Sequence, residues 1–388
     1  MTSTIRAYKT ELRPTRAQAE TLARWCEISM RVYNWGLRGR EAHYLATGQT
    51  LTHYSQDKAF TRLKRDEPEF EFAKEVPRRV AYFALRDLDS AYKHFFRRVK
   101  QGGAKPGFPR LKREGSSFTV YGTDISVGDD RLRLPRLGWL RLKERGYIPV
   151  DADKYGECTV SRRSGRWFVS VMVEEAIPER KADGPAVAAH PGVRHFLTIV
   201  DETGRHERIE NRRALDYYQK RLRRLQRKLA RQKKGSNNRQ KTREQIAKLH
   251  FRIASIRADA THKATHRVTG GLSPQKVVIQ AWRVREMLES ESGLPKWLER
   301  RIKRGIADAN FSELLRQIRY KSGWYGSEVI ELEADVPISK TCSRCGVVKD
   351  DLGMEQTFRC GSCGLEIDRE TNAAYNMLAT LFSEEEVT

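Results

Sequence analysis

The amino-acid sequence predicts an α+β multidomain protein, and three residue patterns support this prediction. Apolar residues recur at helical spacing in the N-terminal part of the chain, and from about residue 117 to 175 the spacing shifts toward two. Near the C-terminus, four cysteines form two closely spaced pairs, which indicates a small metal-binding module. The 388 residues are enough for two or three domains.

The N-terminal half is expected to contain a strand, helices and a β domain, in that order. Residues 1–10 have the pattern of a strand, and Thr15 is a candidate N-cap for the helix that follows. That helix has apolar residues at helical spacing, namely Leu22, Trp25, Ile28, Val32 and Leu37. A second helix is expected at about 77–99. The segments "SFTVYG", "RLRLP", "CTVSRR" and "RWFVSVMVEE" are expected to be the strands of a small β domain.

The segment "VAAHPGVRHFLTIVDETG", residues 187–204, opens the last large domain and reads as two short strands around a turn. His190 stands where the first of these strands ends. Residues 276–284, "KVVIQAWRV", are expected to form another buried strand. More helix is expected up to about Tyr320, then the strand "EVIELEA", and the helix "TNAAYNMLATLF" closes the chain.

The charge of the chain indicates a polyanionic partner. Lys and Arg number 74 against 50 acidic residues, so the formal net charge is +24 and the pI is about 9.9. Nucleic acid is favoured over a membrane surface, because the basic residues are spread over much of the chain. No apolar run approaches the length that spans a bilayer, and the N-terminus lacks the apolar core of a signal peptide. We therefore expect a cytoplasmic protein with no membrane partner.

Residues 212–257 are expected to form a basic helical hairpin. They contain seventeen Lys or Arg and two acids, Asp216 and Glu244, with "KKGSNNRQ" as the loop between two apolar stripes. A merely solvated hairpin is the alternative, but a solvated face usually mixes both signs of charge. On charge alone, the candidates for RNA contact are Arg223, Arg224, Arg227, Lys233 and Lys234.

The paired cysteines predict a structural zinc ribbon. "CSRC" at 342–345 and "CGSC" at 360–363 are separated by fourteen residues, and two such knuckles complete a tetrahedral set of four thiolates around Zn²⁺. The predicted ligands are Cys342, Cys345, Cys360 and Cys363. All four positions are thiols, so no position stays open for catalytic water, and a redox role is the weaker alternative.

Four longer stretches of the sequence are informative together, namely "YKTELRPTRAQAETLARWCEISMRVYNWGL", "FFRRVKQGGAKPGFPRLKREGSSF", "RYKSGWYGSEVIELEADVPISKTCSRCG" and "DRETNAAYNML". They resemble the TnpB family of transposon-encoded RNA-guided nucleases, which are related to type V CRISPR effectors. The resemblance covers nearly the whole chain, and the motifs keep their order and spacing. It implies a guide RNA and a double-stranded DNA target as partners, in a bacterial, nucleoid-associated protein.

The resemblance also implies a domain organisation. A small β-barrel-like, wedge-type domain is expected at 1–10 and 115–180, and a helical recognition domain at 11–114. A RuvC-like, RNase H-type α/β domain is expected at 181–338 and 367–388, with the zinc ribbon inserted at 339–366. By analogy with relatives, the residues expected to face DNA are Arg78, Arg79 and Tyr82 on a helix and Tyr121 and Thr123 in the β domain.

The nuclease site that the resemblance implies departs from the family pattern at all three acidic positions. The first Asp corresponds to His190 in "AAHPG", the Glu to Gln280 in "IQAWR", and the last Asp to Glu370 in "ETNAA". Such sites hold two divalent metals through carboxylates, and Mg²⁺ prefers charged oxygen ligands. Only one carboxylate of the three remains, which is Glu370, or Asp368 if that residue is aligned instead. We therefore expect the free energy of metal binding to weaken by several kcal/mol, where about 1.4 kcal/mol corresponds to a tenfold loss of affinity.

The chain is therefore expected to lack nuclease activity and catalytic Mg²⁺, and to be closest to nuclease-dead TnpB-like repressors that use a guide RNA to occupy DNA. Three alternatives stay open on the sequence. The protein could be an active nuclease with a rearranged site that uses Mn²⁺, a plain RNA-binding scaffold, or a decaying transposon relic. The intact hairpin, cysteines and β domain argue against decay.

Overall fold

The structure of the chain is a computed structural model that describes residues 3–102, 106–176, 182–290, 295–350, 352–353 and 355–383. It divides into two compact units, Met1–Ile177 and Pro178–Thr388. Residues 177–181, where the predicted β domain ends, lie outside the described residues. No helix in the described ranges is both long enough and apolar enough to cross a membrane.

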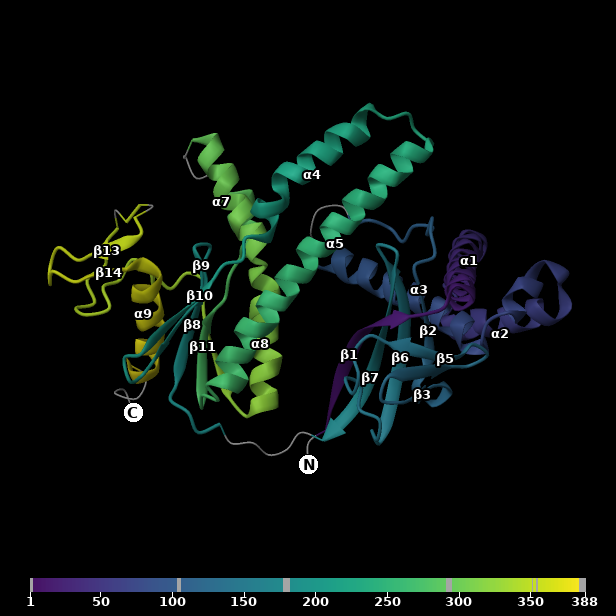
Figure 1. Ribbon diagram of the computed structural model, residues 1–388, viewed down its shortest axis with the longest axis horizontal. Helices are drawn as coiled ribbons and strands as arrows, with labels where there is room; N and C mark the ends of the chain where they lie inside the picture. Colours follow the sequence, from purple (N-terminus) through teal and green to yellow (C-terminus); the bar gives the residue numbers. More distant parts are fainter. Residues whose placement is uncertain are drawn as a thin grey trace. The chain divides into compact units, whose positions relative to one another are not determined.

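The first unit contains a seven-stranded antiparallel sheet in the order β2–β6–β7–β1–β5–β4–β3 (Figure 1). β1 lies in its interior and pairs along its length with β7, from Ser3 opposite Ala176 to Leu12 opposite Trp167. β1 is longer than the predicted strand at 1–10, because the alternation continues to Leu12, whose side chain is buried. The strands are β1 (Ser3–Arg13), β2 (Ser117–Tyr121), β3 (Ser126–Val127), β4 (Arg131–Leu134), β5 (Gly138–Leu142), β6 (Lys154–Arg163) and β7 (Arg166–Ala176).

Helices pack against this sheet through one continuous core. The predicted N-cap is confirmed, because the Thr15 hydroxyl accepts a hydrogen bond from the Gln18 backbone N–H and the Gln18 side chain accepts one from the Thr15 N–H. The core combines Trp25 and Val32 of α1 with Leu85 of α3 and sheet residues such as Phe118. The helices are α1 (Arg16–Thr47), α2 (His53–Asp66) and α3 (Arg78–Lys100), with short 3₁₀ turns η1 (Pro68–Lys74) and η2 (Gly122–Asp124).

The second unit is a three-layer α/β structure around the five-stranded sheet β10–β9–β8–β11–β12. β11 runs parallel to both β8 and β12, whereas β8, β9 and β10 are antiparallel. Helices α5 and α8 lie on one face of this sheet and α9 lies on the other (Figure 1). Val187 and Val277 pack toward α5, α7 and α8, and the alternate residues Ala188 and Val278 pack toward α9. The strands are β8 (Val187–Pro191), β9 (His195–Asp201), β10 (His206–Glu210), β11 (Lys276–Gln280) and β12 (Glu328–Leu332), with β13 (Thr357–Arg359) and β14 (Glu366–Asp368) in the cysteine region.

The predicted strand at 276–284 was too long, because β11 ends at Gln280 and helix α6 begins at Val284. Trp282 continues the apolar pattern of the sequence, but it lies in the connecting segment and its ring packs on Phe311, 4.6 Å away between centroids. The helices of this unit are α4 (Ala214–Arg231), α5 (Asn237–His266), α6 (Val284–Glu289), α7 (Lys296–Ala309), α8 (Phe311–Tyr325) and α9 (Arg369–Ser383), with a π-helical turn η3 (Arg267–Gly271) after α5.

The predicted basic hairpin is confirmed as α4 and α5, which pack along each other and project from the sheet (Figure 1). Leu222, Leu249 and Ile253 are buried between the two helices, and Leu225 and Ile246 are partly buried beside them. The apolar stripes therefore face each other, and this arrangement leaves the basic residues on the outside.

Candidate functional site

A cavity at one end of the second unit's sheet brings together the three positions that the sequence singled out. Val187 of β8 is level with Val277 of β11, so His190 and Gln280, three residues farther along each strand, lie at the same end of the sheet. Glu370 lies in the first turn of α9. All three line one cavity of about 830 Å³. Crevices at the carboxyl ends of parallel strands are where α/β sheets commonly bind ligands.

His190 is a buried, neutral side chain in this cavity wall. Its exposed fraction is 8%, and its Nδ1 atom has no hydrogen-bond partner within the described residues. Burial lowers the pKa of His190 to about 4, and the nearby positive charge of Arg369 acts in the same direction. The imidazole therefore carries no charge at physiological pH.

Gln280 uses its amide nitrogen to bind the segment that follows β12. Nε2 donates to the carbonyl oxygen of Glu333 at 3.1 Å and to that of Val336 at 3.0 Å, and the residue is 6% exposed. Only the NH₂ end of the side chain can face two carbonyl oxygens, since it is the end that carries donors. The carbonyl oxygens of Glu333 and Val336 thus require a hydrogen-bond donor at position 280 and would repel a carboxylate there.

The remaining carboxylates of the cavity are engaged by the protein's own groups. Glu370 Oε2 accepts a hydrogen bond from His195 Nδ1 at 2.7 Å, and Glu370 Oε1 packs so closely on Gly192 that a Cβ atom there would collide with it. Asp368 accepts hydrogen bonds from the Glu370 and Thr371 N–H groups at the start of α9. Its other oxygen forms an ion pair with Arg194 at 3.0 Å.

Sequence reasoning missed His195, Arg194 and Arg208, which all come from β9, β10 or the turn before β9. Arg208 lies 3.7 Å from Asp368 and donates a hydrogen bond to Thr371 at 2.8 Å. The ligand atoms of His195, Asp368 and Glu370 lie within 4.8 Å of one another, so these three could also hold a single metal ion. No local motif indicates this group, because His195 lies 175 residues before Glu370 and meets the two carboxylates only through packing of α9 on the sheet.

The neutral state of His190 predicts a loss of stability at acidic pH. The pKa of this imidazole is about 6.5 in the unfolded chain and about 4 in the folded chain. Its contribution to the free energy of unfolding is therefore fully present above pH 6.5 and is lost as the pH falls toward 4. At pH 5 this difference is worth about 2 kcal/mol. We expect the free energy of unfolding of His190→Gln to fall less between pH 7 and pH 5 than that of the unaltered protein. Parallel losses in both proteins would contradict this assignment.

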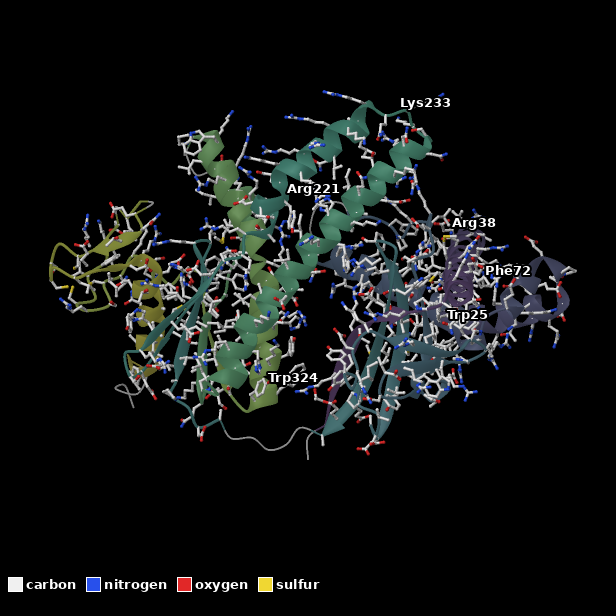
Figure 2. All side chains as sticks on the ribbon, viewed as in Figure 1. Trp25, Arg38, Phe72, Arg221, Lys233 and Trp324 are labelled. Carbon is white, nitrogen blue, oxygen red and sulfur yellow. The ribbon has the colours of Figure 1, made fainter. Side chains whose placement is uncertain are left out.

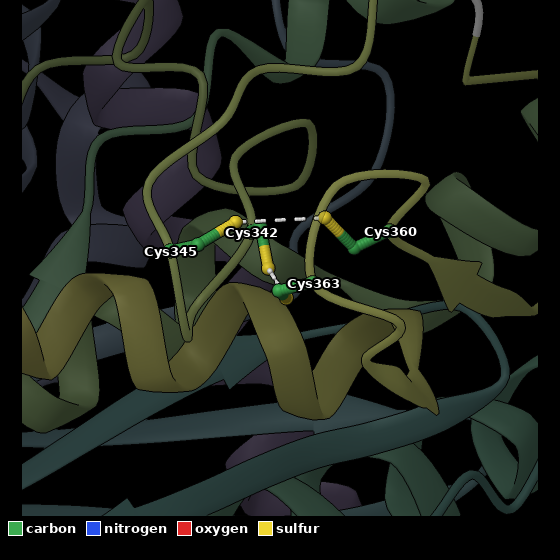
Figure 3. A group of neighbouring side chains, drawn as sticks. All are labelled: Cys342, Cys345, Cys360 and Cys363. Atoms are coloured by element: carbon green, nitrogen blue, oxygen red, sulfur yellow. Dashed lines mark hydrogen bonds between the residues drawn. The ribbon is translucent and has the colours of Figure 1, made fainter.

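The four cysteines of the predicted ribbon form one cluster (Figure 3). Cys342 and Cys363 have sulfur atoms 3.6 Å apart, Cys345 and Cys360 have them 3.5 Å apart, and all four sulfur atoms lie within 4.8 Å of one another. Tetrahedral bonds of about 2.3 Å to zinc put sulfur atoms about 3.8 Å apart. The cluster therefore fits a structural zinc ion with no open ligand position.

The two knuckles of the ribbon have the same backbone conformation. Gly346 and Gly364, each following the second cysteine of a pair, have φ values of 73° and 69°, a region that favours glycine. Their N–H groups bond back to the carbonyls of Cys342 and Cys360. Backbone N–H groups, first that of Cys363, lower the pKa of Cys360 to about 6 and favour its thiolate, whereas burial and the neighbouring sulfur atoms raise the pKa of Cys363.

Two asparagines of α9 attach the ribbon to the rest of the second unit. Asn372 donates to the carbonyl oxygen of Thr341 at 2.7 Å and accepts from the Ser343 N–H at 3.0 Å. Asn376 donates to the carbonyl oxygens of Ile338 and Thr341, both at 2.7 Å. The ribbon and the cavity thus share helix α9, since Glu370 lies two residues before Asn372.

Three of the five residues predicted to face DNA form a cluster in the first unit. The Arg79 guanidinium lies 4.8 Å from the centre of the Tyr121 ring, and the Tyr82 and Tyr121 rings are 6.1 Å apart. Burial and the neighbouring Tyr121 hydroxyl raise the pKa of Tyr82 to about 12. Arg78 and Thr123 are exposed, on the first turn of α3 and in η2 after β2.

The five residues predicted to contact RNA are all exposed on the hairpin of the second unit. Arg223, Arg224 and Arg227 lie on α4, and Lys233 and Lys234 lie in the turn before α5. Figure 2 shows the side chain of Lys233 at the outer turn of the hairpin. Among the described residues, none of these five side chains takes part in an ion pair, so their charges are available to a partner.

Comparison with known protein families finds three models, which match separate parts of the chain. A family described as "Probable transposase", OrfB of IS605, matches residues 168–291, and a Cas12f1-like TNB domain matches residues 311–377. A helix-turn-helix domain model matches residues 1–49, where the structure has β1 and the single long helix α1.

Two similar proteins extend over almost the full length. "Putative RNA-guided DNA endonuclease" of Streptomyces pristinaespiralis is 32% identical over 381 residues, which cover 96% of this chain and 89% of that protein. "Putative RNA-guided DNA endonuclease InsQ" of Escherichia coli K12 is 29% identical and covers 97% of this chain and 92% of its own. The Cas12f1 chain of a cryo-EM structure of a Cas12f1–sgRNA–target DNA complex has the same fold, with a TM-score of 0.54 at 12% identity over 94% of this chain and 83% of that one.

Proposed function

The chain belongs to the TnpB family, that of OrfB of IS605, and we propose that it uses a guide RNA to bind a matching DNA duplex and leaves both strands uncut. The observation that carries this proposal is the chemistry of the cavity. Of the three positions that the resemblance aligns with the metal ligands of the family's nucleases, His190 and Gln280 carry neutral side chains and Glu370 is hydrogen bonded to His195.

Divalent metal binding at this cavity would have to displace contacts that the fold already makes. Mg²⁺ needs several oxygen ligands in near-octahedral geometry, with charge to offset its desolvation. Gln280 turns its donors, and not a charged oxygen, toward the Glu333 and Val336 carbonyls. Asp368, the other nearby carboxylate, pairs with Arg194 and caps α9. These contacts support loss of two-metal cleavage.

Guided binding uses other parts of the chain. The net charge of +24 and the exposed basic hairpin support binding of the guide RNA, with Arg223, Arg224, Arg227, Lys233 and Lys234 as the proposed contacts. The cluster of Arg79, Tyr82 and Tyr121, with Arg78 and Thr123 beside it, is proposed to contact the duplex at a short flanking motif. In RNA-guided effectors, pairing with the guide reads the sequence and the protein reads the motif. A stable R-loop over a promoter would obstruct RNA polymerase, so the proposed outcome is repression of transcription.

The rival candidate is an RNA-guided endonuclease with a rearranged site. The names of both similar proteins favour this candidate, and so does the convergence of His195, Asp368 and Glu370 on one point. A histidine with two carboxylates suits a transition metal such as Mn²⁺ better than Mg²⁺. The ion pair between Arg194 and Asp368 opposes this candidate, because a metal would have to displace the guanidinium.

Guided binding and cleavage are tested together on one end-labelled duplex that carries the flanking motif. We expect the protein purified with its guide RNA to retard a matching duplex and to leave both strands intact in Mg²⁺ and in Mn²⁺. A variant with Arg223→Glu, Arg224→Glu and Arg227→Glu should purify with much less RNA and lose guided binding, whereas its unfolding temperature should stay within a few degrees. Guide-dependent cutting in either metal would overturn the proposal in favour of the endonuclease, and absence of guided binding would overturn both.

A further inference from the structure

Helix α3 carries an apolar stripe that continues beyond the part of the unit that covers it. In the first half of the helix, Val80, Leu85 and Leu88 are completely buried. The stripe continues at helical spacing through Tyr92, Phe95, Phe96 and Val99. There, however, Phe96 is 55% exposed and Val99 is 49% exposed. An exposed apolar stripe on an otherwise well-packed helix indicates a surface with a partner.

The exposed part of the stripe is organised as a cluster of aromatic rings. The Phe108 ring lies 5.2 Å from that of Phe95 and 5.5 Å from that of Tyr92, both edge to face. Phe96 stacks with Tyr92 at 6.3 Å and meets Phe95 edge to face at 5.2 Å. The segment that carries Phe108 is held to α3, because Arg98 donates a hydrogen bond to the Gly107 carbonyl oxygen at 3.1 Å. We call Tyr92, Phe95, Phe96 and Phe108 the aromatic platform.

The charged residues that flank the aromatic platform along the chain are basic, while on α1 Glu41 lies near Tyr92, where burial and then this carboxylate raise the pKa of the tyrosine. The α3 residues from Ser90 to Lys100 include Lys93, Arg97, Arg98 and Lys100 and no acid, and Arg110 and Lys112 follow Phe108. Within the described ranges, none of these six basic residues is in an ion pair. Lys112 already packs on the Tyr33 ring, 4.0 Å from its centre, so the other five carry the argument. Cations near a helix C-terminus also interact favourably with the helix dipole, which accounts for some of these charges. It does not account for exposed phenylalanine rings among them.

Exposed aromatic rings among unpaired cations are the surface that proteins use for unpaired nucleotides. Each base stacks on a ring while the cations follow the phosphates, and this mode needs no particular sequence. A protein partner would be expected to cover the rings with apolar side chains and to offer acidic groups to the cations. A paired duplex offers no free base faces along its length, so the partner must contain unpaired bases.

We propose that the aromatic platform stacks unpaired bases of the displaced DNA strand in the R-loop, an inference that rests on the guided binding proposed above. In that state the target strand is paired with the guide, and the displaced strand is the one whose bases are free. Phe96 lies seventeen residues along α3 from Arg79, which is about 26 Å at 1.5 Å per residue. At the roughly 3.4 Å per nucleotide of a strand in duplex DNA, this distance spans about seven or eight nucleotides, and fewer if the displaced strand is extended.

The experiment compares two substrates and two sets of variants, all with the guide-loaded full-length protein. The first substrate is a full duplex, and the second lacks the displaced strand except within the flanking motif. Phe96→Leu with Phe108→Leu keeps apolar bulk and removes both ring faces, whereas Phe96→Tyr with Phe108→Tyr keeps the rings. Leu45→Ala, at an 87% exposed position on α1, serves as a control for loss of exposed apolar surface.

We expect the double leucine variant to dissociate at least about fivefold faster from the full duplex, because stacking contributes about 1 kcal/mol or more per base. On the substrate without the displaced strand, its dissociation rate should equal that of the unaltered protein. The tyrosine variant and the Leu45→Ala control should behave as the unaltered protein on both substrates. Equal dissociation rates for the leucine and tyrosine variants would overturn this inference and leave the proposed function untouched. An equally faster dissociation of the leucine variant from both substrates would do the same. Failure of the unaltered protein to bind either substrate would overturn the proposed function as well.

Discussion

Replacing Cys360 by alanine is expected to empty the ribbon of zinc and to unfold residues 339–366. The ribbon has a very small core, in which Cys342, Leu352, Phe358 and Cys360 are the buried members. Modules of this size fold because metal binding supplies the free energy, with apparent values of about 10 kcal/mol or more for structural zinc. The loss should reach α9, since Asn372 and Asn376 bind the ribbon backbone.

Elemental analysis and limited proteolysis test this expectation. The unaltered protein should contain one zinc per chain, and Cys360→Ala should contain much less and be cleaved within the ribbon. Cys158→Ala is the matched control, because Cys158 is a fully buried cysteine of the first unit that is not part of the cluster. It should keep its zinc. Full zinc content in Cys360→Ala, or none in the unaltered protein, would contradict the assignment.

Replacing Gln280 by glutamate is expected to destabilise the second unit by about 3 kcal/mol or more. The new carboxylate would be buried against the carbonyl oxygens of Glu333 and Val336, and neither side of the contact would have a donor. The penalty should shrink at acidic pH, where the carboxyl group gains a proton. The measurement is the free energy of unfolding in urea, at pH 7.5 and at pH 5.

Gln280→Met is the control for this substitution, since it removes the two hydrogen bonds without adding charge and should cost less. The same reasoning predicts that His190→Asp, Gln280→Glu and Glu370→Asp together do not restore cutting, because the backbone around position 280 is set for a donor. If Gln280→Glu is as stable as the unaltered protein, the carbonyl groups of Glu333 and Val336 can turn away from a carboxylate at position 280. DNA cutting by the triple variant would then be expected.

The ribbon and the hairpin could be predicted from the sequence because their determinants are local. Cys342 and Cys345 lie three residues apart, and this spacing alone makes a knuckle. In the same way, Leu222 and Leu225 repeat at helical spacing, and a Gly-Ser-Asn loop marks the turn. Position 190 could be placed near a strand end because a short apolar run precedes it and Pro191 and Gly192 follow.

The contacts that decide the state of the cavity could not be predicted, because they join distant segments. Nothing near Gln280 in the sequence indicates that the carbonyls of Glu333 and Val336 face it. The contact of His195 with Glu370 likewise depends on α9 lying across the sheet. The predicted end of the strand at residue 284 was wrong for a related reason. Trp282 packs on Phe311 and does not pair with a neighbouring strand, so its apolar character did not indicate a longer strand.

The interior position of β1 in its sheet has a consequence for synthesis on the ribosome. β1 is the first strand to be made, yet its partner β7 ends at Ala176. At about 5–20 residues per second, roughly 10 to 30 s pass before this pairing can begin. Meanwhile Arg6, Lys9 and Arg13 place charge along the unpaired strand, which discourages pairing with other nascent chains. Before β7 is made, β1 can pair only with β5, and only at Leu12 and Arg13. A nascent chain that stops short of β7 therefore leaves most of its earliest strand without a partner.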